Sequence, residues 1–240
     1  MPLVKSKSMK RVRSQSFTKK RAASTKKVKP SVAIMRGSLS TRKMYPLLPR
    51  TRTTVRYLGN FHTVNPGLGG TADGHVFSAN GLYDPDITGT GHQPGGFDQL
   101  MAMYDQYTVI GAKISVDFYN TDNTNPIFAF VAVRDSTSVD TDTRMLIENG
   151  YVNYRLMNRN TLVPSTTKIN QAVDIAKYLG RGDVMSDPHL KGTITTNPTE
   201  QVYFHVGAYT MNNVDGGDVN LQAVIEYEVV FHERHSVTPS

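Results

Sequence analysis

The sequence contains no cysteine and no tryptophan, and its first acidic residue is Asp73. Without cysteine, disulfide bonds and cysteine-ligated zinc are excluded. No apolar run approaches the roughly eighteen residues that a membrane-spanning helix needs. The N-terminus also lacks the apolar segment of a secretory signal. We therefore expect no disulfide-stabilised fold, no membrane span and no secretory leader.

Charge is divided unequally along the chain. Residues 1–56 hold 17 of the 27 Lys and Arg residues, whereas all 20 Asp and Glu residues lie later. The net charge of +7 therefore combines +17 on an N-terminal arm with −10 on the remainder. The arm is poor in residues that form a core, so it cannot offset the entropy of ordering. We predict a disordered basic N-terminal arm over residues 1–52 and a folded domain over residues 53–240.

This arm is predicted to bind a polyanion. Lys and Arg side chains neutralise phosphates without reading bases, so the number of charges matters more than their order. A solubilising tail is the alternative, but solubility does not require the exclusion of acids from so long a segment. The candidate nucleic-acid-binding residues are Lys5, Lys7, Lys10, Arg11, Arg13, Lys19, Lys20, Arg21, Lys26, Lys27, Lys29, Arg36, Arg42 and Lys43.

Two short motifs suggest contacts with host proteins. Lys26, Lys27 and Lys29 have the spacing of a nuclear-localisation signal, although any strongly basic tail contains such clusters. Arg181, Gly182 and Asp183 form the tripeptide that integrins bind when a loop displays it. A glycine that simply ends a strand is the alternative interpretation of this second motif.

From residue 53 onward, short alternating runs separated by Gly, Pro, Asn and Asp predict an all-β domain. In the clearest strand, 219–233, every second residue from Leu221 to Phe231 is apolar and is predicted to face inward, whereas His232 falls on the polar face. In a second strand, 108–119, every second residue from Ile110 to Phe118 is predicted to face inward. Further strands are predicted at 53–64, 74–83, 126–134, 167–179, 189–195 and 201–211.

Two short helices are predicted, at 96–107 and at 141–150, where Asn149-Gly150 suits a helix C-terminus. About eight strands with long connecting loops are typical of a β-sandwich. The fold class predicted is therefore a single eight-stranded jelly-roll sandwich.

Catalytic and metal motifs are not apparent. No nucleophile elbow, P-loop or dinucleotide fingerprint occurs, and the seven histidines are scattered and predicted to lie on the surface. Acids cluster in loops at Asp84 and Asp86, Asp135, Asp140 and Asp142, Asp183 and Asp187, and Asp215 and Asp218. Such oxygen-rich loops could hold structural calcium, particularly between subunits, but solvated turns are the favoured interpretation. We predict no catalytic residues, no cofactor and no metal ligands.

The block GTGHQPGGFDQLMAMYDQYTVIGAKISVDF, residues 89–118, resembles a segment of known viral coat proteins. These are the capsid proteins of circular, replication-initiator-encoding single-stranded DNA viruses, the circoviruses and their unclassified relatives. In that family an amphipathic helical turn leads through an aromatic-rich link, here Tyr104 and Tyr107, into a long strand. Residues 168–180 and the strands that follow also resemble the family's second half. The Lys-rich arm and the lack of tryptophan favour a divergent relative.

The resemblance implies a non-enzymatic coat protein that assembles ~60 copies into a closed icosahedral shell around single-stranded DNA. About a thousand arm charges would then face inward. It further implies a virion location, assembly in the host nucleus and contact with nuclear import machinery. Alternatives are the coat protein of a small single-stranded RNA virus and a non-viral nucleic-acid-binding module with a basic tail. A jelly-roll enzyme or lectin would need a converging cluster of acids or histidines, which the sequence does not reveal.

Overall fold

A computed structural model of the protein describes residues 47–67, 69–120, 125–157, 165–210 and 215–236. The chain divides into two units, Met1–Met44 and Tyr45–Ser240, and the described residues all belong to the second. Its strands are β1 (Arg50–Leu58), β2 (His62–Val64), β3 (Asp73–Ser78), β4 (Tyr104–Asn120), β5 (Ile127–Arg134), β6 (Val152–Met157), β7 (Ser165–Asp174), β8 (Lys191–Gly192), β9 (Tyr203–Thr210) and β10 (Val219–Arg234). Its helical turns are α1 (Phe97–Met101), α2 (Thr143–Glu148), α3 (Ile175–Tyr178) and the 3-10 turn η2 (Pro188–Leu190).

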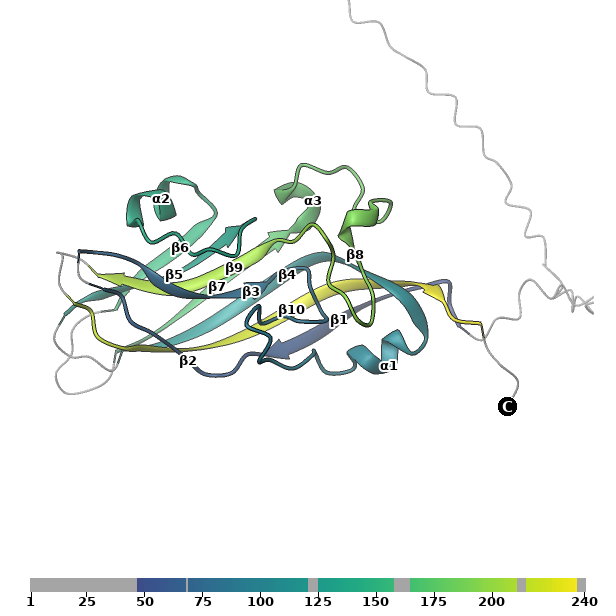
Figure 1. Cartoon of the computed structure of the whole chain (residues 1–240), viewed down its shortest axis with the longest axis horizontal. Coiled ribbons are helices and arrows are strands. Elements are labelled where there is room, and N and C mark those ends of the chain that lie inside the picture. Colours follow the sequence, from purple (N-terminus) through teal and green to yellow (C-terminus); the bar gives the residue numbers. More distant parts are fainter. Residues whose placement is uncertain (1–46, 68, 121–124, 158–164, 211–214, 237–240) are drawn as a thin grey trace, which may run out of the picture. The chain divides into compact units, whose positions relative to one another are not determined.

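The strands form two antiparallel sheets that face each other (Figure 1). The first has the order β1-β10-β4-β7, with β2 added to β10 and β8 added to β4, and the second has the order β3-β9-β5-β6. When β2 and β8 are left out and the eight long strands are counted from 1 to 8 in chain order, the first sheet has the order 1-8-3-6 and the second has the order 2-7-4-5. This is the strand order of a jelly roll, so the predicted fold class is confirmed.

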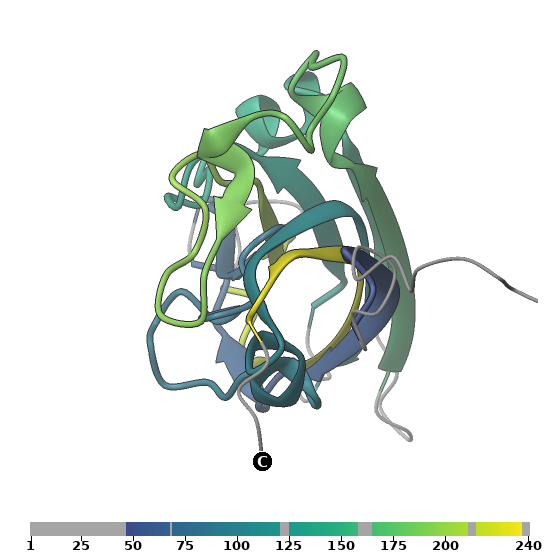
Figure 2. The same ribbon diagram turned by 90° about the vertical axis from the view of Figure 1, so that its right-hand side faces the viewer.

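The long strands β4 and β10 form the middle of the first sheet. Their pairing runs from Asn120 opposite Val219 to Tyr104 opposite Arg234. The alternating apolar side chains of β10 are fully buried between the sheets, as predicted: Leu221, Ala223, Ile225, Tyr227, Val229 and Phe231. Viewed from the end, this strand lies against β1 on one side and β4 on the other (Figure 2).

A register shift corrects the prediction for the start of β4. Glu228 pairs with Gly111 but Val229 pairs with Val109, so Ile110 is an extra residue on this strand. Such a bulge reverses the inward and outward alternation. Val109 is buried and Ile110 is only partly so, although the sequence pattern had assigned Ile110 inward.

Other predicted strands differ in extent from the observed ones. The segment 53–64 contains two strands, β1 and β2, and 167–179 ends in the turn α3, because Asp174 caps it by accepting a hydrogen bond from the Lys177 amide. The segment 189–195 supplies only the two residues of β8. The eighth long strand is instead β6, an edge strand with mostly exposed residues that the sequence analysis missed.

The predicted helix at 96–107 is also shorter than expected. Only Phe97–Met101 is helical, and Tyr104 already belongs to β4, because the chain must enter the sheet there. The second helix, α2, lies within the predicted 141–150, and Gly150 follows its C-cap with a φ of 69°. That conformation suits glycine, as the Asn149-Gly150 pair predicted.

Buried tyrosines join the first sheet to the connections of the second. The Tyr227 hydroxyl donates to the Ser78 carbonyl oxygen at 2.7 Å, and the Tyr107 hydroxyl accepts from the Leu82 amide at 3.0 Å. Both side chains are fully buried, so each hydroxyl requires a partner. In the part of the chain that the structure describes, no helix is long and apolar enough to cross a membrane.

Candidate functional site

The candidate nucleic-acid-binding residues from Lys5 to Lys43, including the candidate import signal Lys26, Lys27 and Lys29, lie outside the described residues. The first basic side chains that the structure places are those of β1, which begins at Arg50, before the predicted domain boundary at residue 53. On the outer face of the sheet, Arg52 pairs with Glu228, and Arg56 pairs with Glu226 at 2.5 Å. These arginines of the acid-free segment are therefore paired with acids of the folded domain.

The Arg181-Gly182-Asp183 motif follows α3 on the surface. The Arg181 guanidinium pairs with Glu200 at 2.8 Å and with Asp187 at 3.6 Å. Asp183 Oδ1 accepts a hydrogen bond from the Met185 amide at 2.9 Å. Both charged side chains thus have partners within the subunit, and receptor binding by this motif stays a prediction.

Most of the acid clusters cap turns. The carboxylates of Asp142, Asp183, Asp187 and Asp215 each accept a hydrogen bond from a main-chain amide two residues later. This is the usual local role of aspartate in turns. It agrees with the interpretation of these residues as turn formers rather than as calcium ligands.

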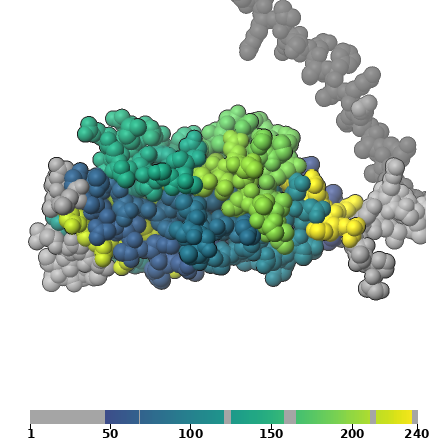
Figure 3. All heavy atoms as spheres, viewed as in Figure 1, coloured from purple at the N-terminus to yellow at the C-terminus, as the bar shows by residue number. Residues whose placement is uncertain are grey.

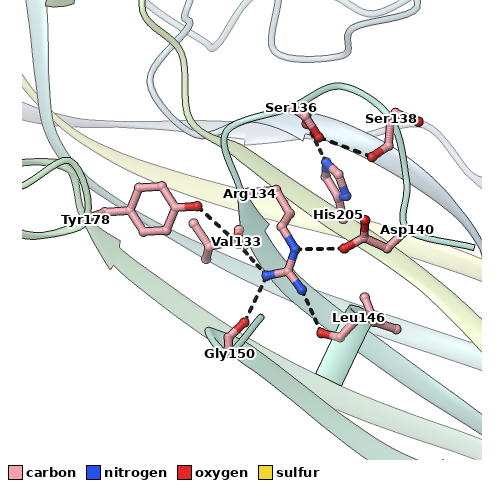
Figure 4. Close-up of polar contacts among 9 residues, drawn as sticks. All are labelled: Val133, Arg134, Ser136, Ser138, Asp140, Leu146, Gly150, Tyr178 and His205. Atoms are coloured by element: carbon pink, nitrogen blue, oxygen red, sulfur yellow. Dashed lines mark hydrogen bonds and ion pairs between the residues drawn. The ribbon is translucent and has the colours of Figure 1, made fainter. Parts of the chain in front are cut away.

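Arg134, at the end of β5, organises the long connection to β6 (Figure 4). Its buried guanidinium donates to the carbonyl oxygens of Val133 at 2.8 Å, Gly150 at 2.9 Å and Leu146 at 2.6 Å. Its Nε donates to Asp140 at 3.1 Å. Two of the carbonyls belong to the end of α2, where a cation is favourable. One arginine therefore caps the helix and neutralises a loop carboxylate.

His205 of β9 lies beside this arginine (Figure 4). Its Nε2 donates to the Ser136 carbonyl oxygen at 2.7 Å, whereas its buried Nδ1 has no partner. Burial lowers the pKa of His205, and the nearby Arg134 lowers it further, against opposing effects of the Ser136 hydrogen bond and of two acids. The imidazole is consequently neutral in the folded chain around neutral pH.

The prediction that the histidines lie on the surface is wrong for His205 and His232. His92, His189 and His235 are exposed, but His205 and His232 are buried and His62 and His75 are partly buried. His232 lies on the predicted polar face of β10, where the alternation predicted exposure. It is buried there against Thr108, whose hydroxyl lies 3.0 Å from His232 Nε2. The alternation within one strand cannot predict burial of a side chain by residues from other parts of the fold.

His62, His75 and Asp86 converge at one edge of the sandwich, a cluster that the sequence analysis missed. His62 Nε2 lies 3.3 Å from Asp86 Oδ2, and His75 Nε2 lies 2.9 Å from Asp86 Oδ1. The Asp86 side chain is fully buried, contrary to the solvated turn predicted for it. The three residues come from separate parts of the chain, so no spacing motif marked them. The acid pair Asp84 and Asp86 was the only available signal.

Exposed apolar side chains gather on the segment of α2 and β6. Met145, Ile147, Tyr151, Tyr154 and Leu156, which we call the α2–β6 patch, are all exposed. The segment that carries them lies along the upper left edge of the space-filling view, in teal-green (Figure 3). Large exposed apolar groups are a usual feature of protein–protein contacts.

The fold defines the described domain as an eight-stranded jelly-roll sandwich with long loops. No protein-family model and no curated protein matches the chain. Among solved structures, one described as the 60-mer BFDV capsid protein aligns with 10% identity and a TM-score of 0.42, over 81% of this chain and 100% of its own. The semi-empty virus-like particle of Macrobrachium rosenbergii nodavirus aligns with 14% identity and a TM-score of 0.39, over 93% and 98%. Desmodium yellow mottle tymovirus aligns with 12% identity and a TM-score of 0.34, over 82% and 97%. The fold assignment depends on the strand pairing of this chain and not on these alignments.

Replacing Arg134 with leucine should destabilise the domain strongly. The Arg134→Leu change removes the arginine donor from three main-chain carbonyls and from Asp140, and of these carbonyls Val133 keeps a hydrogen bond from the Tyr178 hydroxyl. The expected loss is about 3 kcal/mol of unfolding free energy, measured by denaturant titration of the unassembled chain. Arg144→Leu is the control, since Arg144 is 87% exposed and lies 4.0 Å from its acid. Equal losses for the two variants would contradict the capping role of Arg134.

The His205→Gln variant should have a weaker pH dependence of stability. The pKa of His205 is lower in the folded chain than in the unfolded chain, where it is about 6.5. The unfolded chain therefore binds more protons below that pH, and the unfolding free energy falls as pH falls. The slope of unfolding free energy against pH from neutral to acidic values should decrease in His205→Gln. It should persist in part, because the pKa values of His75 and His232 are also lowered, and an unchanged slope in His205→Gln would contradict the role assigned to His205.

Proposed function

We propose that this chain is the coat protein of a small icosahedral virus, with a structural rather than an enzymatic role. The observation that carries the proposal is that one chain combines a basic segment without acidic residues, 1–56, with a complete jelly-roll sandwich. A jelly roll is a common shell-forming domain. A basic arm supplies the charge that a packaged nucleic acid requires.

The arm would act inside the shell. Multiplied over ~60 copies, its charges neutralise about a thousand phosphates, which suits a small single-stranded genome. Arg52 and Arg56 already pair with Glu228 and Glu226, so the residues before β1 supply the phosphate contacts. The acidic balance of the folded domain limits nucleic-acid binding to the arm. We further propose DNA as the cargo, following the resemblance of residues 89–118.

The subunit contacts would be made by the folded domain. The α2–β6 patch is a candidate contact, because it exposes five large apolar side chains. Phe61, 68% exposed, is a second candidate on the connection between β1 and β2. Burial of such residues against neighbouring subunits is a usual source of assembly energy.

Deletion of residues 1–45 should leave a folded domain that still assembles, but into empty or irregular particles. The domain's strands and core all lie later in the chain, so its β-rich circular dichroism should persist. Sedimentation and negative-stain microscopy should reveal megadalton particles for the full chain. A species near the 26.6 kDa monomer or its dimer would instead indicate a nucleic-acid-binding module. Loss of the β signal on truncation would contradict the division into arm and shell domain.

Packaging should depend on the charge of the arm rather than on its sequence. Replacing Lys19, Lys20, Arg21, Lys26, Lys27 and Lys29 with glutamine should reduce the nucleic acid recovered from nuclease-treated particles. The salt dependence of single-strand binding should also become shallower, by about 0.7 in the logarithmic slope per lost contact. A scrambled arm of the same composition is the matched control and should package normally. DNase and RNase digestion of the recovered cargo then distinguishes DNA from RNA.

A further inference from the structure

Ligand atoms from both sheets meet at one edge of the sandwich. His62 belongs to β2, which pairs with β10 of the first sheet, and His75 belongs to β3, which pairs with β9 of the second. Asp86 is placed by a bridge between its own backbone and that of Phe77. A group bound to all three side chains would therefore connect the two sheets directly.

Asp86 is oriented through one of its two oxygens. Asp86 Oδ1 accepts hydrogen bonds from the Thr88 amide at 3.1 Å and from the Thr88 hydroxyl at 2.8 Å. It also lies 2.9 Å from His75 Nε2. Asp86 Oδ2 is buried and has no hydrogen-bond partner. Thr88 thus holds the carboxylate in one orientation while the second oxygen stays available.

The available oxygen faces a second unsatisfied atom. His62 Nε2 lies 3.3 Å from Asp86 Oδ2, but this contact lacks hydrogen-bond alignment, and both atoms are buried without a hydrogen-bond partner. Buried polar atoms of this kind usually have a partner. A ligand between the two atoms and His75 Nε2 would satisfy them together.

The two imidazole rings are packed together. Their centroids are 3.5 Å apart with an interplanar angle of 21°, and Phe77 packs edge-on against both rings. Two protonated imidazoles at this distance would repel each other. Neutral imidazole is the form that binds metal ions.

We propose that His62, His75 and Asp86 bind a divalent transition-metal ion of the zinc type, which ties the two sheets together. Two imidazole nitrogens and one carboxylate oxygen form a known zinc ligand set, with a fourth position left for water. All three ligand atoms lie within 4.8 Å of one another. Tetrahedral coordination at about 2.0–2.1 Å from the metal separates ligand atoms by roughly 3.3 Å. The distance of 3.3 Å between His62 Nε2 and Asp86 Oδ2, the available oxygen, matches that separation.

The ligand set and its surroundings also define the class of metal. Calcium takes six to eight oxygen ligands, and one carboxylate cannot supply them, whereas imidazole suits zinc and its neighbours. The side chains of His62 and His75 are 17% and 13% exposed, so the cluster lies close to the surface although His62 Nε2 and Asp86 Oδ2 are themselves buried. Residues 1–61 contain no histidine, so the basic arm offers no competing imidazole.

Zinc binding to the full-length chain tests this proposal. The chain is freed of nucleic acid in high salt, treated with a chelator, dialysed and titrated calorimetrically with zinc chloride. We expect one ion per chain and a higher melting temperature with zinc, because an ion that binds only the folded state stabilises it. Cobalt(II) in place of zinc should give the visible absorption of a tetrahedral site with nitrogen and oxygen ligands, a readout that requires no variant.

Variants identify the ligands. His62→Gln, His75→Gln and Asp86→Asn should each weaken zinc binding by at least about 100-fold, and Thr88→Val, which loosens Asp86, by about 10- to 100-fold. The matched control is His235→Gln. His235 Nε2 lies 3.1 Å from Asp105 in an exposed pair, and among the described residues no third ligand joins it, so this variant should bind as the parent does. Circular dichroism establishes that each variant is folded, and His62→Gln, at the most exposed ligand, is the variant least disturbing to the core.

The proposal is overturned by any of three results. These are no zinc binding by the parent chain, zinc binding unchanged in the folded His62→Gln and Thr88→Val variants, or a cobalt spectrum typical of the hydrated ion. A cluster that holds only protons would give the first result together with a melting temperature that responds to pH but not to chelator. Since every readout is made on the unassembled chain, the outcome does not depend on shell formation.

Discussion

The pairing of β10 with β4 on one side and β1 on the other is the interaction on which the rest of the structure depends. β10 contributes a continuous row of fully buried side chains to the space between the sheets. It also brings the end of the described chain next to its beginning, because Arg50 pairs with His232. Burial of such a row is the dominant favourable term in folding. The second sheet, the loops and the buried tyrosines are arranged around it.

The polar interactions of the domain have a different role, because they position the loops. Arg134 binds the end of α2, Tyr227 binds Ser78 at the end of β3, and aspartates close the turns on the surface. Each buried polar atom in these networks would be costly without its partner. The cluster of His62, His75 and Asp86 differs from these networks, because two of its buried atoms without a hydrogen-bond partner, His62 Nε2 and Asp86 Oδ2, lie 3.3 Å apart and face each other. This is the physical reason to regard it as a binding site rather than as another loop anchor.

The charge pattern complements the fold in the function that we propose. A jelly roll alone is compatible with many activities, so the shell proposal needs the acid-free segment as well. The outer face of β1 illustrates how the two parts differ. Its arginines are paired with Glu226 and Glu228, and exposed pairs of this kind contribute at most about 1 kcal/mol each. These pairs neutralise the charges of Arg52 and Arg56 on the surface of the domain. The excess positive charge that we assign to nucleic-acid binding then lies in the residues before β1.

The sequence by itself determined the charge partition, the all-β class, the inward face of β10 and the Asn149-Gly150 end of α2. These properties follow from local composition and from the two-residue period of a strand. Only the tertiary structure decided the rest. It placed the bulge at Ile110, made β6 an edge strand, buried His232 and brought His62, His75 and Asp86 together. Each of these depends on which segment lies next to which, and contacts between residues far apart in the chain leave no periodic signal in the sequence.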